Sequence, residues 1–243
     1  EFLSVLKEFY EYYNHFSTNY ISKKQNLYLS LIILSSQTYL SKFKKTDLES
    51  YDDAFFTKYV YGTTSIEGNT CTLRETSLIL DESISVGGKK LREIFEIENY
   101  RKMNQYIKSL KLEKLQIDLN FVKKIHSMLL ANIENSGNGD FRNIEVYVKG
   151  AVFQPTPAIF IEDEMNDLID FYIKNIEKMH PIELIATFHH KFESIHPFMD
   201  GNGRVGREIM RIMLKKLQLP TIFIDQSNRN EYLEALAEGD KGN

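Results

Sequence analysis

The sequence has little of several features that mark particular protein classes. Its 243 residues include one cysteine, Cys71, which excludes an internal disulfide and makes a reducing cytoplasm the simplest location. No apolar run approaches the roughly 18 residues that a membrane-spanning helix needs, and the start of the chain lacks the basic and apolar regions of a signal peptide. The net charge of −4 offers no general attraction to nucleic acid or to membranes. We therefore expect a soluble cytoplasmic protein with neither kind of partner.

What the sequence does contain is a hydrophobic fraction of 42%, enough for a sizeable core, with apolar residues at helical spacing along most of the chain. This pattern predicts helices over residues 2–18, 24–41, 51–67, 91–111, 118–134, 161–178, 181–195, 204–218 and 228–238. Between Gly139 and Glu162 the pattern changes, because Val146, Val148 and Val152 alternate with other residues as in a β-hairpin. We predict an all-α fold with one small β-hairpin at about residues 144–157.

One turn carries more chemistry than a linker needs. From His196 to Arg207 the chain reads HPFMDGNGRVGR, which supplies a base, a carboxylate, glycines and two arginines. Pro197 disfavours helical geometry at His196, so one helix should end there and the next should begin near Gly203. Arg204 and Arg207 would then lie in the first turn, where cations oppose the helix dipole unless an anion is bound. Backbone N–H groups freed by glycine, together with a helix N-terminus, favour a phosphate as that anion.

Two side chains of the turn can do more than bind phosphate. Asp200 would repel a phosphate unless a hard cation such as Mg²⁺ lay between them, so it is a candidate metal ligand. His196 can take up a proton near neutral pH and could reach an incoming hydroxyl. A base, a metal and a phosphate site together indicate transfer of a phosphorus-containing group.

Two other interpretations of this region are less well supported. Residues 201–206 fit the GxGxxG pattern of a dinucleotide fold, with Asp225 at about the ribose-binding distance, but no buried strand precedes them. His189, Glu193 and His196 have a helical spacing that would suit zinc, yet no cysteine or third histidine is obviously available on that face. We expect His189 and His190 to be a pair of partly buried, hydrogen-bonded residues instead.

The turn resembles the HxFx(D/E)GNGRxxR motif of the Fic domain family and matches it at every defined position. The resemblance implies transfer of AMP from ATP to a Tyr, Thr or Ser hydroxyl of a protein. It implies that His196 deprotonates the target hydroxyl, that Phe198 anchors the loop in the core, and that Asp200 holds Mg²⁺ on the α and β phosphates. The other motif residues would bind ATP: Gly201, Asn202 and Gly203 the α-phosphate, Arg204 the β-phosphate and Arg207 the γ-phosphate.

A second segment, Thr63 to Gly68, matches the (S/T)xxxE(G/N) pattern of an inhibitory helix in Fic proteins. Gly68 is suited to ending a helix, which places Glu67 beside exposed C-terminal carbonyls. A carboxylate there should seek a cation, and the resemblance supplies Arg207 as its partner. We expect Thr63 and Glu67 to inhibit the enzyme by excluding the γ-phosphate. The alternative is a chance match, with Glu67 a solvated residue at the end of a helix.

The resemblance also assigns the predicted hairpin as a flap on which the protein substrate docks by strand addition. A hairpin that only covers the core is the alternative. Behind the motif, Tyr232 and its neighbours resemble the segment that supports the nucleotide base. We expect Tyr232 and Asp240 on the adenine side, and Asp240 stands where some relatives have asparagine.

We predict an N-terminal helical extension over residues 1–54 and a Fic domain over residues 55–240. This domain would contain the inhibitory helix at about 55–68, the flap and the catalytic loop at 196–207. The predicted function is that of an autoinhibited protein adenylyltransferase that uses ATP and Mg²⁺. Self-modification and a homodimer are further expectations, and the aromatic-rich start of the chain suits either helix packing or a subunit contact. The alternatives are transfer of UMP, phosphate or phosphocholine, removal of AMP, and a catalytically idle regulator that binds nucleotide. A further C-terminal module would fit the resemblance.

Overall fold

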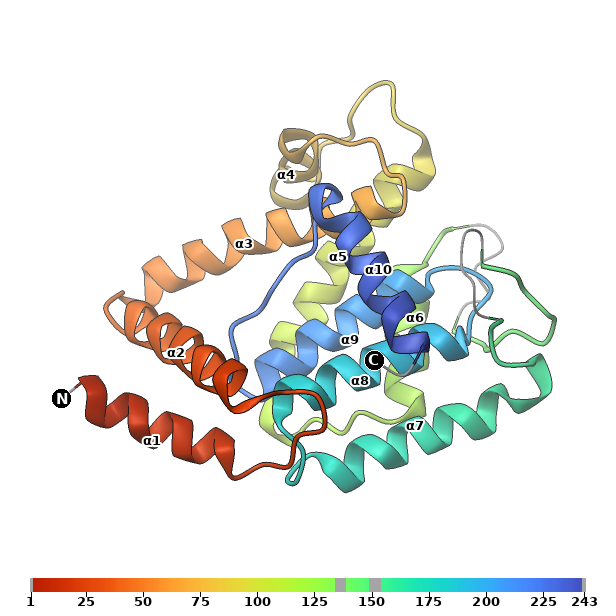
Figure 1. Ribbon diagram of the computed structural model, residues 1–243. Helices are drawn as coiled ribbons and strands as arrows, with labels where there is room; N and C mark the ends of the chain where they lie inside the picture. The colour runs from red at the N-terminus through yellow and green to blue at the C-terminus, as the bar shows by residue number, and fades with distance from the viewer. Residues whose placement is uncertain (1, 134–138, 149–153, 242–243) are drawn as a thin grey trace.

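Helices make up almost all of the regular structure in a computed structural model that describes residues 2–133, 139–148 and 154–241 (Figure 1). The α-helices are α1 (Phe2–Asn14), α2 (Lys23–Leu40), α3 (Lys45–Ile66), α4 (Leu73–Glu82), α5 (Leu91–Ser109), α6 (Leu119–Leu129), α7 (Ile161–Asn175), α8 (Pro181–Ile195), α9 (Asn202–Lys216) and α10 (Arg229–Asp240). Short 3₁₀ turns lie at Leu112–Lys114, Ala158–Phe160 and Gln226–Asn228. The predicted helical character is confirmed.

Helix α9 is the centre of the fold, and α3, α6 and α8 pack against it (Figure 1). Its apolar side chains Val205, Ile209 and Ile212 are fully buried, as the helical spacing predicts. Unusually, the same helix also buries several charged residues, namely Arg204, Arg207, Glu208 and Arg211. Burying a charge is costly unless it is paired. Glu208 and Arg211 pair with each other, whereas Arg204 and Arg207 pair with glutamates outside α9. The helix that forms the core therefore also organises an ion-pair network.

Helix α4 is missing from the sequence-based prediction. It begins with a capping box, in which Thr72 accepts a hydrogen bond from the backbone N–H of Glu75 and Glu75 accepts one from the backbone N–H of Thr72. A threonine followed three residues later by glutamate is the usual sequence signal for such a start. The helix was therefore predictable from its cap, although it is short.

The first two helices pair with each other, and both they and the segment after α1 contact the rest of the fold. Ser17 forms a parallel β-bridge with Met179, and the backbone N–H of Asn19 donates to Oε1 of Glu183 at 2.8 Å. Helix α3 begins at Lys45, so the predicted boundary between residues 54 and 55 falls inside it. The division into an extension and a domain stays a prediction.

The predicted β-hairpin is not shown. Residues 139–148 and 154–157 contain no strand, and residues 149–153 lie outside the described residues. Side chains supply contacts between the two ends of this segment: the backbone N–H of Ala158, for example, donates to Oε1 of Glu145 at 3.0 Å. None of the helices in the described part of the chain combines the length and the apolar character that crossing a bilayer requires.

Candidate active site

The turn between α8 and α9 has the geometry that its proline and glycines dictate. Helix α8 ends at Ile195, and His196 adopts a left-handed conformation with φ of 52° and ψ of 59°. Pro197 follows, and Gly201, with φ of 81°, leads into α9. A side chain at Gly201 would also approach Leu130 to 2.5 Å, so both conformation and space require glycine. Helix α9 begins at Asn202, close to the predicted start.

Two contacts hold the turn rigid from inside. Phe198 is fully buried and stacks on the His126 ring with a centroid distance of 3.8 Å. The Asn202 side chain accepts from the backbone N–H of Phe198 and donates to its carbonyl, both at 2.8 Å. The N-terminus of α9 has no side-chain cap, so its first N–H groups remain available to an anion.

Arg207 projects from α9 toward the end of α3. Its Nε donates to Oγ1 of Thr63 at 2.7 Å, and its Nη2 donates to Oε1 of Glu67 at 2.5 Å. A Cβ atom at Gly203 would lie 2.6 Å from the same glutamate oxygen. The Glu67 carboxylate therefore lies directly above the first turn of α9 and is paired with Arg207.

A second ion-pair network lies on the other side of the turn. Arg204 donates to Asp200 at 2.9 Å and to Glu96 of α5 at 3.0 Å. Arg92, also on α5, donates to the second Asp200 oxygen at 2.5 Å. Asp200 is thus held between two guanidinium groups, and its side chain remains 33% exposed.

These neighbours set the charge of the titratable groups. Burial of Glu67 opposes its ionisation, but the charge and hydrogen bond of Arg207 outweigh burial and hold its pKa below the ordinary value. Asp200 behaves in the same way, since Arg204 and Arg92 lower its pKa against burial. Burial, reinforced by a nearby arginine at position 142, lowers the pKa of His196. Near neutral pH the site therefore contains two carboxylates and a neutral imidazole that can accept a proton.

Comparison with known proteins identifies the family of this chain. Residues 116–214, from α6 to α9, match the model of the Fic/DOC family. The chain belongs to the Fic/DOC family. A crystal structure of a Fic domain containing signaling protein from Bacteroides thetaiotaomicron matches with a TM-score of 0.78 and 26% identity, over 86% of this chain and 80% of that one. Fic-1 from C. elegans, residues 134–508, matches with a TM-score of 0.70 and 24% identity, over 99% of this chain and 64% of that one.

Two curated relatives cover most of this Fic chain. The protein adenylyltransferase Fic of Nematostella vectensis is 33% identical over 192 residues, which are 78% of this chain and 44% of the relative. The protein of the same name from Drosophila grimshawi is 31% identical over 192 residues, again 78% of this chain, and 39% of the relative. The chain thus spans roughly two fifths of the length of these relatives.

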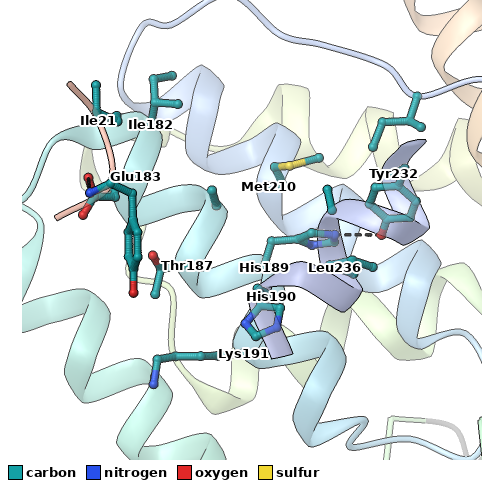
Figure 2. Close-up of a pocket in the computed structure, with 15 residues that line it drawn as sticks. Ile21, Ile182, Glu183, Thr187, His189, His190, Lys191, Met210, Tyr232 and Leu236 are labelled. Carbon is teal, nitrogen blue, oxygen red and sulfur yellow. Dashed lines mark hydrogen bonds between the residues drawn. The ribbon is translucent and has the colours of Figure 1, made fainter. Parts of the chain in front are cut away.

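The predicted base-side residues lie on α10 of the Fic chain, next to α8. The Tyr232 hydroxyl is 2.8 Å from Nε2 of His189 (Figure 2). The Tyr232 ring lies 5.9 Å from the Arg207 guanidinium carbon. Asp240 is 2.9 Å from Nε2 of His190. These contacts show His189 as the buried, hydrogen-bonded residue that the sequence predicts.

A cavity of about 590 Å³ opens between α8, α9 and α10 (Figure 2). His189, Tyr232 and Met210 line it, and the motif from His196 to Arg207 contributes none of its lining residues. The alternative of a zinc site receives no support, because no group of three His, Cys, Asp or Glu side chains suited to a metal occurs among the described residues.

Sequence reasoning missed three residues around the motif, Arg92 and Glu96 on α5 and Arg142 before α7, and it considered Glu193 on α8 only as a possible zinc ligand. Arg92 and Glu96 stand four residues apart on one helix face, which predicts a pair with each other. Nothing in that spacing predicts that the pair reaches Asp200 and Arg204 from more than 100 positions away, because that contact depends on helix packing. The missed residues are those whose roles come from tertiary structure.

Proposed function

We propose that this chain is the catalytic part of a protein adenylyltransferase, which transfers AMP from ATP to a Tyr, Thr or Ser hydroxyl of a target protein. The observation that carries the proposal is a neutral His196 next to the uncapped N-terminus of α9, with Arg204 in the first turn of that helix and Arg207 in the second. The names of the fly and sea-anemone relatives support the same activity. The single cysteine, Cys71, suits a cytoplasmic location.

The reaction follows from these groups. A ring nitrogen of His196 accepts the proton of the target hydroxyl, and the hydroxyl oxygen attacks the α-phosphorus of ATP. A new P–O bond forms as the bond to the bridging oxygen breaks, and pyrophosphate leaves with that electron pair. The N–H groups at the start of α9, with Arg204 and Arg207, offset charge on the phosphate oxygens. Positioning and charge neutralisation supply most of the catalysis, because the chain forms no covalent intermediate in this scheme.

Asp200 is the residue that would hold magnesium. The donor set fits, since Mg²⁺ in nucleotide sites is commonly bound by one or two carboxylates together with substrate phosphates and water. The Asp200 carboxylate is ionised, and it is reachable because its side chain is partly exposed. Its two arginine contacts would have to rearrange to free an oxygen. When bound, the metal would neutralise charge on the α and β phosphates.

We propose that Glu67 inhibits the enzyme. Its carboxylate occupies the space above Gly203 and uses the Arg207 guanidinium, two groups that ATP would need for its α- and γ-phosphates. Thr63 supports the inhibited arrangement by accepting from Nε of Arg207. Because this ion pair is largely buried, ATP cannot take Arg207 without separating it.

The test compares Glu67→Gly with the unmodified chain, each incubated with cell extract and with ATP labelled at either the α- or the γ-phosphate. We expect Glu67→Gly to incorporate the α-label and not the γ-label, and the unmodified chain to incorporate far less. Glu49→Gly, an exposed change on the same helix α3, is the matched control and should behave like the unmodified chain. Adding His196→Ala to Glu67→Gly should abolish transfer.

Other labels separate the remaining hypotheses. Transfer of the γ-label, of UMP or of phosphocholine in place of AMP would identify another donor. Absence of any transfer, with ATP still bound, would identify an idle regulator. Labelling of the chain itself would reveal self-modification. Docking of the substrate at residues 144–157 and formation of a homodimer stay proposals that the same proteins can be used to test.

A further inference from the structure

Arg142 is a buried cation next to the catalytic turn that neither the motif nor the proposed mechanism uses. Its side chain is 0% exposed. Three of its nitrogens donate to backbone carbonyls in three parts of the chain. Nε donates to the carbonyl of His196 at 2.8 Å, Nη1 to that of Ile144 at 2.9 Å, and Nη2 to that of Thr156 and, at 3.4 Å, to that of Ile195.

The carbonyls that accept from Arg142 lie in two places: the end of α8 and the two ends of the segment predicted as the flap. Ile195 is the last residue of α8 and His196 is its C-cap, where carbonyls lack helical partners and the helix dipole favours a cation. Ile144 and Thr156 lie at the two ends of the segment that was predicted as the flap. One guanidinium therefore joins both ends of that segment to the end of the catalytic helix.

Arginine is the residue suited to this position. Its planar group presents five donors in fixed directions, whereas lysine offers three at a single point. Among the described residues its one ion pair is a distant one, to Glu145, which is 3.9 Å away on a side chain that is 56% exposed. Burying this charge is costly, and carbonyl hydrogen bonds are what offset the cost.

Arg142 also fixes the backbone of the catalytic histidine. His196 has a left-handed conformation, which a non-glycine residue keeps only where its surroundings hold it. The His196 N–H donates to the carbonyl of Phe192 at 3.0 Å, and its own carbonyl accepts from Arg142. The backbone N–H of Arg142 donates in turn to the carbonyl of Pro197 at 2.9 Å. Both peptide groups of His196 and the one that follows are therefore held.

We propose that Arg142 is a positioning residue, which fixes His196 relative to Ile144 and Thr156 so that a bound target hydroxyl meets the imidazole. The inference rests on the proposed adenylyltransferase function. Arg142 makes no contact with Arg204, Arg207 or Asp200 among the hydrogen bonds described above. Its removal should therefore affect the transfer step and leave ATP binding in place.

The first test measures AMP transfer by Arg142→Lys and Arg142→Met, both in the Glu67→Gly background. We expect kcat to fall by about 100-fold for Met and by about 10-fold or more for Lys, since small displacements of a catalytic group have effects of this size. The KM for ATP should stay within about twofold. Arg101→Met is the matched control, because this arginine on α5 pairs with Glu98 of the same helix. Thermal unfolding of each variant checks that it is folded.

The second test needs no activity. An NMR titration of the His196 ring should show a higher pKa in Arg142→Met than in Arg142→Lys. Lysine keeps a positive charge at position 142, and that charge disfavours the imidazolium. Burial has the larger effect on the pKa of His196, and the charges of Glu67 and Asp200 raise it. Asp200 is present in every variant and Glu67 is replaced in every one, so neither contributes to the difference. If Arg142→Met fails to fold, the same titration of Arg142→Lys against the parent should still show a displaced ring signal.

The outcomes are distinct. Loss of kcat with unchanged KM for ATP supports the positioning role. Full activity of folded Arg142→Lys and Arg142→Met, or equal His196 titration in all variants, overturns it. If Glu67→Gly itself transfers no AMP, the proposed function fails, and the titration alone decides whether Arg142 acts on His196.

Discussion

Glu193 provides a test of the site that does not depend on any assumed activity. This residue of α8 has a side chain that is only 13% exposed, and its Oε1 is buried without a hydrogen-bond partner. The charges of Arg207 and Glu67 act on this carboxyl group. Nε2 of His189 lies 4.0 Å from its Oε1. Burial is the largest influence and raises the pKa of Glu193 from an ordinary value of 4.5 to about 7, with Arg207 opposing and Glu67 reinforcing the rise. The residue is therefore a carboxylic acid that the fold prefers to keep protonated.

The sign of the effect on stability follows from proton binding. Between pH 4.5 and about 7 the folded chain holds a proton on Glu193 that the unfolded chain has released, so the free energy of unfolding falls as pH rises through this window. At about 1.4 kcal/mol per pH unit, the loss reaches about 3 kcal/mol once pH exceeds the folded pKa. Glu193→Gln cannot release a proton and should not show this loss.

The assay is urea unfolding of both proteins at pH 4.5 and pH 8. We expect the stability of Glu193→Gln relative to the unmodified chain to increase by about 3 kcal/mol between these two conditions. Glu234→Gln, which removes an exposed carboxylate on α10, is the control and should change neither value. A difference that stays constant within about 0.5 kcal/mol, a usual error of such extrapolations, would refute the reasoning.

Three further predictions concern the scaffold of the turn and can be checked by urea unfolding. Phe198→Ala removes a fully buried ring and should cost about 3–5 kcal/mol of stability. Asn202→Ala leaves the backbone N–H and carbonyl of Phe198 without their side-chain partners and should cost about 1–3 kcal/mol, so no loss would contradict the assigned hydrogen bonds. Gly206→Ala places a Cβ atom 3.0 Å from the His189 ring and closer still to Glu193, and should cost about 1–3 kcal/mol.

The turn from His196 to Arg207 was predictable because its information is local. Pro197 and Gly201 constrain the backbone within a few residues of themselves, and the turn ends and begins helices where these residues require. The pairing of Glu67 with Arg207 joins residues 140 positions apart and came from a resemblance between motifs, not from spacing. The position of Arg142 had no such signal, because its acceptors are backbone carbonyls, which carry no sequence identity.

In the fold, too, the features that repeat along the sequence were predictable and the others were not. Long amphipathic helices such as α9 repeat their apolar spacing often enough to be recognised, whereas α4 has only 10 residues and needed its capping box to be noticed. The alternating valines at 146 and 148 predicted strands that the described residues do not contain. In that segment Arg142 and Glu145 bind backbone groups that a β-ladder would otherwise pair.

The two helices that flank the candidate nucleotide site differ greatly in how they are anchored. Helix α9, which would face the phosphates, is buried along most of its length, whereas α10, which carries Tyr232 and Asp240, has no buried residue and lies at the surface of the fold (Figure 1). Local opening requires little free energy where few apolar contacts are broken. Amide hydrogens of α10 should therefore exchange with solvent far sooner than those of α9, and a nucleotide that touches both helices should slow exchange mainly in α10. Recognition of the base would then be an ordering event, built onto a phosphate site that is already rigid.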